Sequence, residues 1–294
     1  MPSMDANGIN ISYDSVGKGP SVVFVHGGYG GASSTVVPRD EGWVEGLADS
    51  YNVITYDRRS SGQTSYPASE HTLDMFVDDL AGLLDGLGIS KMFLIGSSAG
   101  GPIALKYSFK YPESIIGLIL ANTSSRIWAH EGRLAASKEL EKRIALLREK
   151  GSEEAFNILR GDDLDAKPFH LVNQKPNPMP VGFDTTRNQK IKRLQHALNR
   201  DSKIKYFAGE LRNQAAYLDS DVTANLGSIG VPTLVVHGNL DTQVPYDLGK
   251  ELSVHIKNAR FVTIPKAGHG VMQWPKSVSA IREFCDEIMS LKKG

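Results

Sequence analysis

The sequence predicts a doubly wound α/β fold with a mostly parallel sheet and a helical segment inserted into it. Short β-branched runs alternate with helical patterns, as in a sheet whose two faces are covered by helices. The alternation stops after residue 122 and resumes near residue 231, which indicates an insertion. With 294 residues, 40% of them apolar, the chain is long enough for one large domain with such an insertion.

The strands are predicted from runs of apolar and β-branched residues. Six runs have the composition of strands that are buried on both faces: residues 21–27, 52–57, 92–96, 115–122, 233–238 and 261–265. An earlier run, residues 9–17, is predicted as an antiparallel edge strand. Residues 73–88 are a predicted helix, because apolar residues recur there at the spacing of one helix face.

The middle of the chain is polar and helical in pattern and shows no strand signal. It divides the chain into a first core part (residues 1–123), an insertion (residues 124–225) and a second core part (residues 226–294). An insertion after a parallel strand starts where that strand ends. We therefore expect residues 124–225 to form a cap over the carboxyl edge of the sheet.

Charge and cysteine content limit the partners and the compartment. The 33 basic and 33 acidic side chains give a net charge of zero, so no long-range attraction to nucleic acid or an anionic membrane is expected. The single Cys285 excludes an intramolecular disulfide. No apolar run has the length of a membrane span, and the first residues do not have the pattern of a signal peptide. These features predict a cytoplasmic protein that acts on a small molecule, and they leave the oligomeric state open.

A candidate nucleophile lies in the stretch "FLIGSSAGG", residues 93–101. A serine nucleophile on such a sheet needs a sharp turn between a strand and a helix, with small residues two positions before and after it. Ser98 has Gly96 and Gly100 at these positions, whereas Ser97 has Ile95 two positions before it. Ser98 is therefore the predicted nucleophile. The alternative is an ordinary turn rich in glycine and serine.

A serine hydroxyl becomes nucleophilic when a histidine accepts its proton and a carboxylate orients that histidine. His269 follows the last predicted strand on a glycine-flanked loop, and Asp241 follows the strand at 233–238. The order Ser98, Asp241, His269 is the order that this architecture uses. Asp241 has the alternative role of a helix N-cap. His26 and His237 end predicted strands, where hydrogen bonds from their rings are expected to brace loops.

The mechanism also needs N–H donors for an oxyanion. One is expected from Ala99, directly after the nucleophile, and a second from the loop "HGGYGGAS" after the first parallel strand. Gly28 is the preferred second donor and Tyr29 the next choice. A dinucleotide-binding loop is the alternative, but this stretch lacks the third glycine of GxGxxG. No cofactor and no metal are expected.

These motifs together resemble those of the α/β-hydrolase superfamily, in particular its small serine hydrolases with a helical cap. The resemblance covers nearly the whole chain and includes "VHGGYGG", "YDRRSSGQTS", the turn at Ser98, "HGNLDTQVP" and "AGHG". It implies an eight-stranded, mostly parallel sheet with a lid inserted after the sixth strand. One departure is Ser60, which replaces a glycine that is usual in the family; Asp57 and Arg58 beside it are expected to anchor their loop.

The resemblance leaves the reaction open, because one fold serves many reactions. Hydrolysis of a small carboxylic ester or lactone is the leading hypothesis, and Trp128 and Trp274 are candidate substrate-binding residues. Carbon–carbon bond hydrolysis of a diketone-like substrate and cofactor-free perhydrolysis are alternatives. An aminopeptidase is less favoured, because Tyr29 and Ala99 replace a proline and a tryptophan of the proline iminopeptidases. A receptor that binds a ligand without turnover is the alternative outside enzymes.

Overall fold

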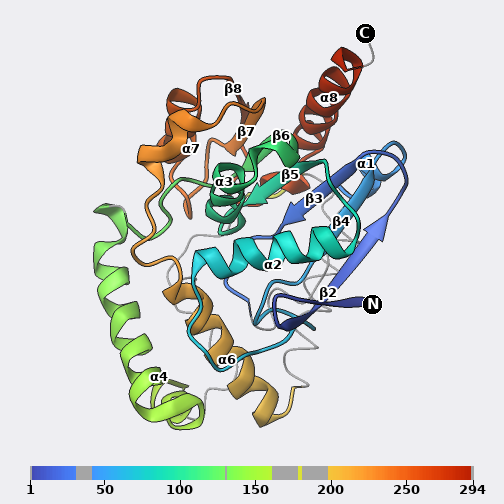
Figure 1. Cartoon of the computed structure of the whole chain (residues 1–294). Coiled ribbons are helices and arrows are strands. Elements are labelled where there is room, and N and C mark those ends of the chain that lie inside the picture. The colour runs from blue at the N-terminus through green and yellow to red at the C-terminus, as the bar shows by residue number, and fades with distance from the viewer. Residues whose placement is uncertain (1, 31–41, 130, 161–177, 181–197, 293–294) are drawn as a thin grey trace.

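The computed structural model describes residues 2–30, 42–129, 131–160, 178–180 and 198–292 (Figure 1). Their strands form one eight-stranded sheet in the order β1-β2-β4-β3-β5-β6-β7-β8. In chain order the strands are β1 (Ser3–Ala6), β2 (Ile9–Val16), β3 (Ser21–Val25), β4 (Asn52–Tyr56), β5 (Met92–Ser97), β6 (Ile115–Ala121), β7 (Thr233–Gly238) and β8 (Ala259–Ile264). The strands from β4 through β3 to β8 pair in parallel, and β2 pairs antiparallel with both β1 and β4. The predicted fold class is confirmed.

The predicted edge strand is not at the edge. β2 matches the run at 9–17, but β1 lies outside it and forms the true edge. Asn7 and Gly8 connect the two strands with positive φ angles of 49° and 75°, the conformation of a tight two-residue hairpin turn. β1 escaped prediction because it has only four residues and no buried side chain, so it carries no apolar run.

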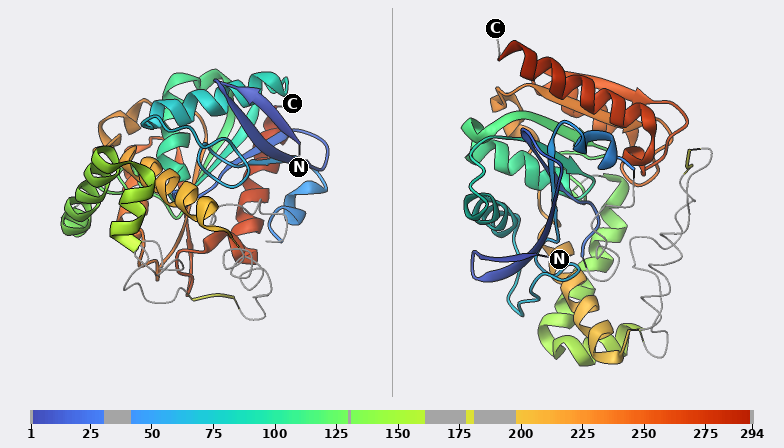
Figure 2. Two further views of the ribbon diagram at one scale, coloured as in Figure 1. Left: turned by 90° about the horizontal axis from the view of Figure 1, so that it is seen from below. Right: turned by 90° about the vertical axis from the view of Figure 1, so that its right-hand side faces the viewer.

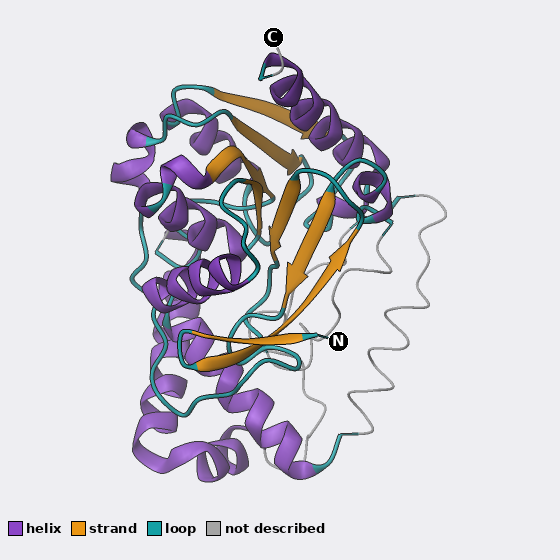
Figure 3. Ribbon diagram, turned by 45° about the vertical axis from the view of Figure 1, so that its right-hand side comes forward, coloured by secondary structure: helices purple, strands orange, loops and turns teal. Residues whose placement is uncertain are grey.

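Helices cover both faces of the sheet (Figure 3). The α-helices are α1 (Glu45–Ala48), α2 (Leu73–Gly86), α3 (Gly100–Lys110), α4 (Leu134–Arg160), α6 (Arg200–Ala215), α7 (Tyr246–His255) and α8 (Pro275–Leu291). Short 3-10 helices are η3 (Pro112–Ser114), η4 (Glu131–Arg133), η6 (Thr223–Ser228) and η7 (Val271–Gln273). Buried side chains of α2, α3 and α7 belong to one apolar cluster, and those of α1 and α8 to the other.

The two clusters follow from the alternation of side chains along a strand. In β5, Met92 and Leu94 contribute to the cluster under α2 and α3, whereas Phe93 and Ile95 contribute to the one under α8. All six residues of β5 are buried, as predicted for a strand covered on both faces. This packing fixes the end of β5, where Ser98 follows.

The helical segment inserted between β6 and β7 contributes α4 and α6, which lie side by side (Figure 1). In the right-hand view of Figure 2 they lie at the end of the molecule opposite α8. α4 bends at Gly151, whose φ of 78° is not helical. Among the described helices, none combines the length and the apolar character that crossing a membrane requires.

Candidate active site

The turn between β5 and α3 places Ser98 in a strained conformation. Its φ is 50°, which is uncommon for a residue with a side chain. A Cβ atom on Gly96 would lie 2.7 Å from the Cβ of Ala104, and one on Gly100 would lie 2.1 Å from the carbonyl oxygen of Val25. The turn therefore requires glycine at both positions. Ser97, in contrast, is the last residue of β5 and is buried.

Three sequence-predicted residues come together at this turn. His269 Nε2 lies 2.8 Å from Ser98 Oγ, and its Nδ1 lies 2.9 Å from Asp241 Oδ2. Ser98 follows β5, Asp241 follows β7 and His269 follows β8, so all three meet at the carboxyl edge of the parallel strands. In this arrangement Nδ1 donates to the carboxylate, so Nε2 is the nitrogen that accepts the proton of the serine hydroxyl.

The carboxylate of Asp241 is held by several donors. Its Oδ1 accepts hydrogen bonds from the backbone N–H groups of Gln243 (2.8 Å) and Val244 (3.0 Å). These bonds form a turn before α7, whose own N-cap position is Pro245, so Asp241 does not cap that helix. Burial of the carboxylate alone would raise its pKa. Hydrogen bonds from His237 and His269 outweigh this effect and hold the pKa of Asp241 below its usual range.

A second histidine contacts the same carboxylate. His237 in β7 is fully buried, and its Nε2 lies 3.3 Å from Asp241 Oδ2 and 3.1 Å from the carbonyl oxygen of Val244. Both neighbours are acceptors, so Nε2 carries the proton. Gly249 packs against this ring. A side chain at this position would not fit, because its Cβ would lie 2.0 Å from His237 Nδ1. The ring braces the Asp241 loop, as expected from its place at the end of a strand.

The loop after β3 is anchored by His26 and Arg58. His26 Nδ1 donates to the carbonyl oxygen of Gly27 (2.7 Å), and its Nε2 accepts from the backbone N–H of Arg58 (3.2 Å). Burial and the charge of Arg58 lower the pKa of His26 to about 3, so this ring is neutral near neutral pH. The guanidinium of Arg58 donates to the carbonyl oxygen of Gly28.

This anchoring sets the direction of the loop's N–H groups. In a trans peptide the N–H points away from the carbonyl oxygen of the same unit. Because the carbonyls of Gly27 and Gly28 are held by His26 and Arg58, the N–H groups of Gly28 and Tyr29 face the other way. Gly27 itself lies against the nucleophile, since a Cβ there would be 2.8 Å from the Cβ of Ser98. The geometry is compatible with either Gly28 or Tyr29 as the second oxyanion donor.

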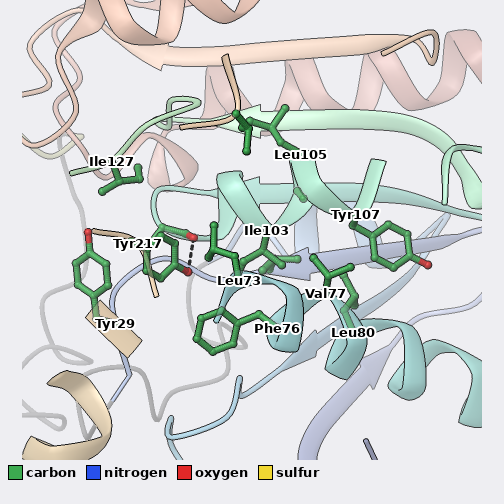
Figure 4. Close-up of a cluster of buried hydrophobic side chains, with 14 of the residues drawn as sticks. Tyr29, Leu73, Phe76, Val77, Leu80, Ile103, Leu105, Tyr107, Ile127 and Tyr217 are labelled. Atoms are coloured by element: carbon green, nitrogen blue, oxygen red, sulfur yellow. Dashed lines mark hydrogen bonds between the residues drawn. The ribbon is translucent and has the colours of Figure 1, made fainter. Parts of the chain in front are cut away.

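Tyr217 connects this loop to the turn at Ser98. Its hydroxyl accepts a hydrogen bond from Arg58 Nη1 (2.5 Å) and donates one to the carbonyl oxygen of Ala99 (2.7 Å). Figure 4 shows the dashed hydrogen bond of Tyr217, with the ring packed near Phe76 and Tyr29. The hydrogen bonds of Tyr217 and this role of Arg58 were not predicted from the sequence. The sequence indicated only that Arg58 would anchor its own loop.

Ala99 directly follows the serine, and Gly28 follows the glycine that packs against it. Ala99 is at the N-cap position of α3, where backbone N–H groups point out of the helix and favour negative charge. Within the residues that the structure describes, neither of these two N–H groups donates a hydrogen bond. The site thus combines a serine–histidine–aspartate arrangement with N–H groups that can receive a developing negative charge.

Trp128 and Trp274, the two residues predicted to bind substrate, differ in burial and surroundings. Trp128 is 1% exposed; its ring lies 6.0 Å from that of Tyr29, and the Arg133 guanidinium lies 5.1 Å from its centre. A substrate reaches Trp128 only after a change in this packing. Trp274 is partly buried and precedes α8, five positions after His269. Tyr29 is 6% exposed and packs against Trp128 and Tyr217.

A cavity of about 600 Å³ lies elsewhere, at the junction of α2, α4 and α6. It is lined by charged and polar residues that include Glu70, Arg148 and Arg212, and by none of Ser98, Asp241 and His269. It is therefore not a pocket at the serine. Across the described ranges, no three His, Cys, Asp or Glu side chains gather as metal ligands.

Comparison with known proteins agrees with this architecture. The family model described as "alpha/beta hydrolase fold" matches residues 20–274. A curated proline iminopeptidase from Saccharolobus solfataricus is 29% identical, over 97% of this chain and 91% of the relative. A putative carbamate hydrolase, RutD, from Agrobacterium fabrum is 28% identical, over 85% of this chain and 86% of the relative. Among solved structures, a thermophilic esterase from Thermogutta terrifontis superposes with a TM-score of 0.69 at 25% identity, covering 97% of both chains.

Proposed function

The chain belongs to the alpha/beta hydrolase fold family, and on this premise we propose that it is a serine hydrolase that cleaves a small carboxylic ester or lactone through an acyl-enzyme. The observation that carries the proposal is the contact of 2.8 Å between Ser98 Oγ and His269 Nε2, at a turn where Ser98 has a φ of 50°. Such strain persists where the surrounding structure enforces it, and it is typical of functional sites.

In the proposed reaction, Ser98 Oγ attacks the carbonyl carbon while His269 Nε2 accepts the hydroxyl proton. The tetrahedral intermediate collapses when the bond to the leaving oxygen breaks, and His269 gives its proton to that oxygen. Water then attacks the acyl-enzyme, again with His269 as the base, and releases the acid and free Ser98. Asp241 remains ionised throughout, because its hydrogen bonds hold its pKa below the usual range.

We assign the oxyanion contacts to the backbone. Ala99 N–H supplies one donor, and Gly28 N–H or Tyr29 N–H supplies the other. Preorganised donors of this kind typically contribute a factor of about 10²–10³ each to kcat. His26 and Arg58 support the proposal, because they hold the carbonyls of Gly27 and Gly28, which share peptide units with the N–H groups of Gly28 and Tyr29.

An ester or lactone is favoured over an amine-bearing peptide by the residues next to Ser98. Ala99 offers no polar side chain beside the nucleophile, and the side chains around the loop at Tyr29 are aromatic: Trp128 and Tyr217. The esterase among the solved structures supports this choice, and the proline iminopeptidase relative keeps aminopeptidase activity as the competing outcome. The cap role of residues 124–225 is part of the proposal. Tyr217, within that range, contacts the turn at Ser98.

Stopped-flow kinetics with p-nitrophenyl acetate tests the proposal. We expect a burst of p-nitrophenol that approaches one equivalent per protein, followed by slower steady turnover, because with this activated ester acylation is faster than deacylation. Ser98→Ala should abolish both phases. A protein that binds the ester without releasing p-nitrophenol would be a receptor, and turnover that survives in Ser98→Ala would move the reaction to another residue.

A further inference from the structure

Two peptide units form the proposed oxyanion site, and one of them joins Ser98 to Ala99. Its N–H is the donor assigned to Ala99, and its carbonyl oxygen, that of Ser98, points the opposite way because the unit is planar and trans. Whatever holds the Ser98 carbonyl therefore also aims the Ala99 N–H. This inference rests on the proposed function, since an oxyanion forms only if Ser98 attacks a carbonyl.

The Ser98 carbonyl is held by a side chain from a neighbouring strand end. Thr123 Oγ1 donates to it at 2.6 Å, and the backbone N–H of Gly101 donates at 2.9 Å. The other acceptor near this hydroxyl, the carbonyl oxygen of Ser124, is 3.5 Å away. Because a hydroxyl has one proton to donate, the shorter bond to Ser98 is the one that forms.

The surroundings keep Thr123 in this position. Its side chain is fully buried, and Gly101 leaves room for it, since a Cβ on Gly101 would lie 2.0 Å from Thr123 Oγ1. The N–H of Ser98 donates to the carbonyl oxygen of Ala121 at 3.0 Å. Both backbone groups of the strained Ser98 are thus tied to the segment that ends β6.

We propose that Thr123 is a positioning residue for the oxyanion site: its hydroxyl fixes the Ser98–Ala99 peptide plane so that the Ala99 N–H faces the reacting carbonyl. The Thr123 hydroxyl contacts the backbone carbonyls of Ser98 and Ser124 and acts through the first of them. Its effect is on the tetrahedral stage of the reaction, where the negative charge develops, and not on the binding of the neutral ester.

Replacement of the hydroxyl by a methyl group tests this role. Removal of an oxyanion donor lowers kcat by a factor of about 10²–10³. In Thr123→Val the Ala99 N–H remains but is less well oriented, so kcat should fall by less, about tenfold. In Thr123→Val we expect this loss with KM within about twofold of wild type. A trifluoromethyl ketone, which forms a tetrahedral adduct with the serine, should bind about tenfold more weakly. Thr123→Ser keeps the hydroxyl and should recover most of the lost turnover.

Ser108→Ala is the matched control. The Ser108 hydroxyl is also buried and donates to a backbone carbonyl, that of Leu105 at 2.7 Å, but within α3 and away from the serine. Its loss should lower stability without changing kcat. If Thr123→Val does not fold, Thr123→Ala is measured in the same assays, because it also lacks the hydroxyl.

The outcomes separate this inference from the proposed function. Wild-type protein that shows a burst while Thr123→Val has unchanged kcat would overturn the role of Thr123 alone. A loss confined to KM, or equal impairment of Thr123→Ser and Thr123→Val, would also overturn it. Absence of any burst in wild type, with turnover unaffected in Ser98→Ala, would remove the proposed function itself.

Discussion

At the scale of single residues, the candidate site is organised around one carboxylate and one imidazole. Asp241 receives hydrogen bonds from two backbone N–H groups and two histidine rings, so its negative charge is compensated without a cationic partner. His269 is left with one nitrogen facing Asp241 and the other facing Ser98. We therefore expect protonation of His269, and not of Asp241, to remove activity on acidification.

The pH dependence of kcat/KM tests this division of roles. Protonated His269 cannot accept the proton of Ser98, whereas Asp241 stays ionised because its pKa is held below the usual range. We expect log(kcat/KM) to fall on the acid side with a slope of one, since a single proton inactivates the site. A slope of two would mean that Asp241 titrates together with the histidine.

Asp241→Asn should lower kcat by about 10⁴-fold, because the amide no longer favours the histidine tautomer that accepts the serine proton. Steady-state kinetics on the same ester measures this loss. Asp85→Asn, on the exposed face of α2, is the control and should have wild-type kinetics. An Asp241→Asn protein of near wild-type activity would place the acid elsewhere.

The sequence predicted which three residues meet at the site, because each leaves a local signal. Ser98 has its flanking glycines, and Asp241 and His269 each follow a strand run. It did not predict the contact between Arg58 and Tyr217, which are 159 positions apart. A hydrogen bond across that distance depends on how the inserted segment packs, and it leaves no periodic pattern in the chain.

At the scale of elements, the parallel strands and α2 were predictable and the hairpin at the edge was missed. Runs buried on both faces carry a strong apolar signal, whereas β1 alternates between exposed and half-buried residues. The Asn7–Gly8 pair was the usable signal for a hairpin. The segment after α6 also contacts the site, because it brings Tyr217 to the turn between β5 and α3.

Tyr217→Phe tests this link between the inserted segment and the core. The variant removes the hydroxyl that bonds both the Ala99 carbonyl and Arg58 Nη1. Each of these buried groups then lacks one hydrogen bond, so we expect the free energy of unfolding to fall by about 1–3 kcal/mol. We also expect lower kcat, since Arg58 holds the oxyanion loop. Urea unfolding and steady-state kinetics measure the two effects.

Tyr107→Phe is the control for that experiment. Its ring is also buried, but its hydroxyl only accepts a hydrogen bond of 3.3 Å from Ser114, away from the site. It should change kcat little. Equal kinetic effects in Tyr107→Phe and Tyr217→Phe would show that the hydrogen bonds of Tyr217 to Arg58 and Ala99 have no specific role in the reaction.

At the scale of the whole molecule, the sheet brings Ser98, Asp241 and His269 to one edge, and we propose that the inserted segment selects the substrate that reaches them. The sequence predicted the edge because parallel strands end there together. It did not predict the shape of the substrate site, which depends on contacts between distant side chains. The packing of Trp128 against Tyr29 and the cavity at α2, α4 and α6 are both of this kind.

A substrate panel tests the whole-molecule proposal. We expect short p-nitrophenyl esters and lactones to be hydrolysed with higher kcat/KM than long-chain esters, aminoacyl anilides or a vinylogous diketone. The reason is that Ala99, the residue next to the nucleophile, offers no polar side chain to bind an amine. Faster turnover of the anilide would favour an aminopeptidase, and faster turnover of the diketone would favour carbon–carbon bond hydrolysis.

The most direct test of the account is to find the residue that becomes covalently modified. After reaction with a fluorophosphonate, intact-mass spectrometry should show one adduct per chain, and peptide mapping should place it on Ser98. Ser97→Ala should still be labelled, because Ser97 belongs to the buried strand β5, and Ser98→Ala should not. An adduct that persists in Ser98→Ala, or that maps to Ser97, would contradict the assignment of the nucleophile.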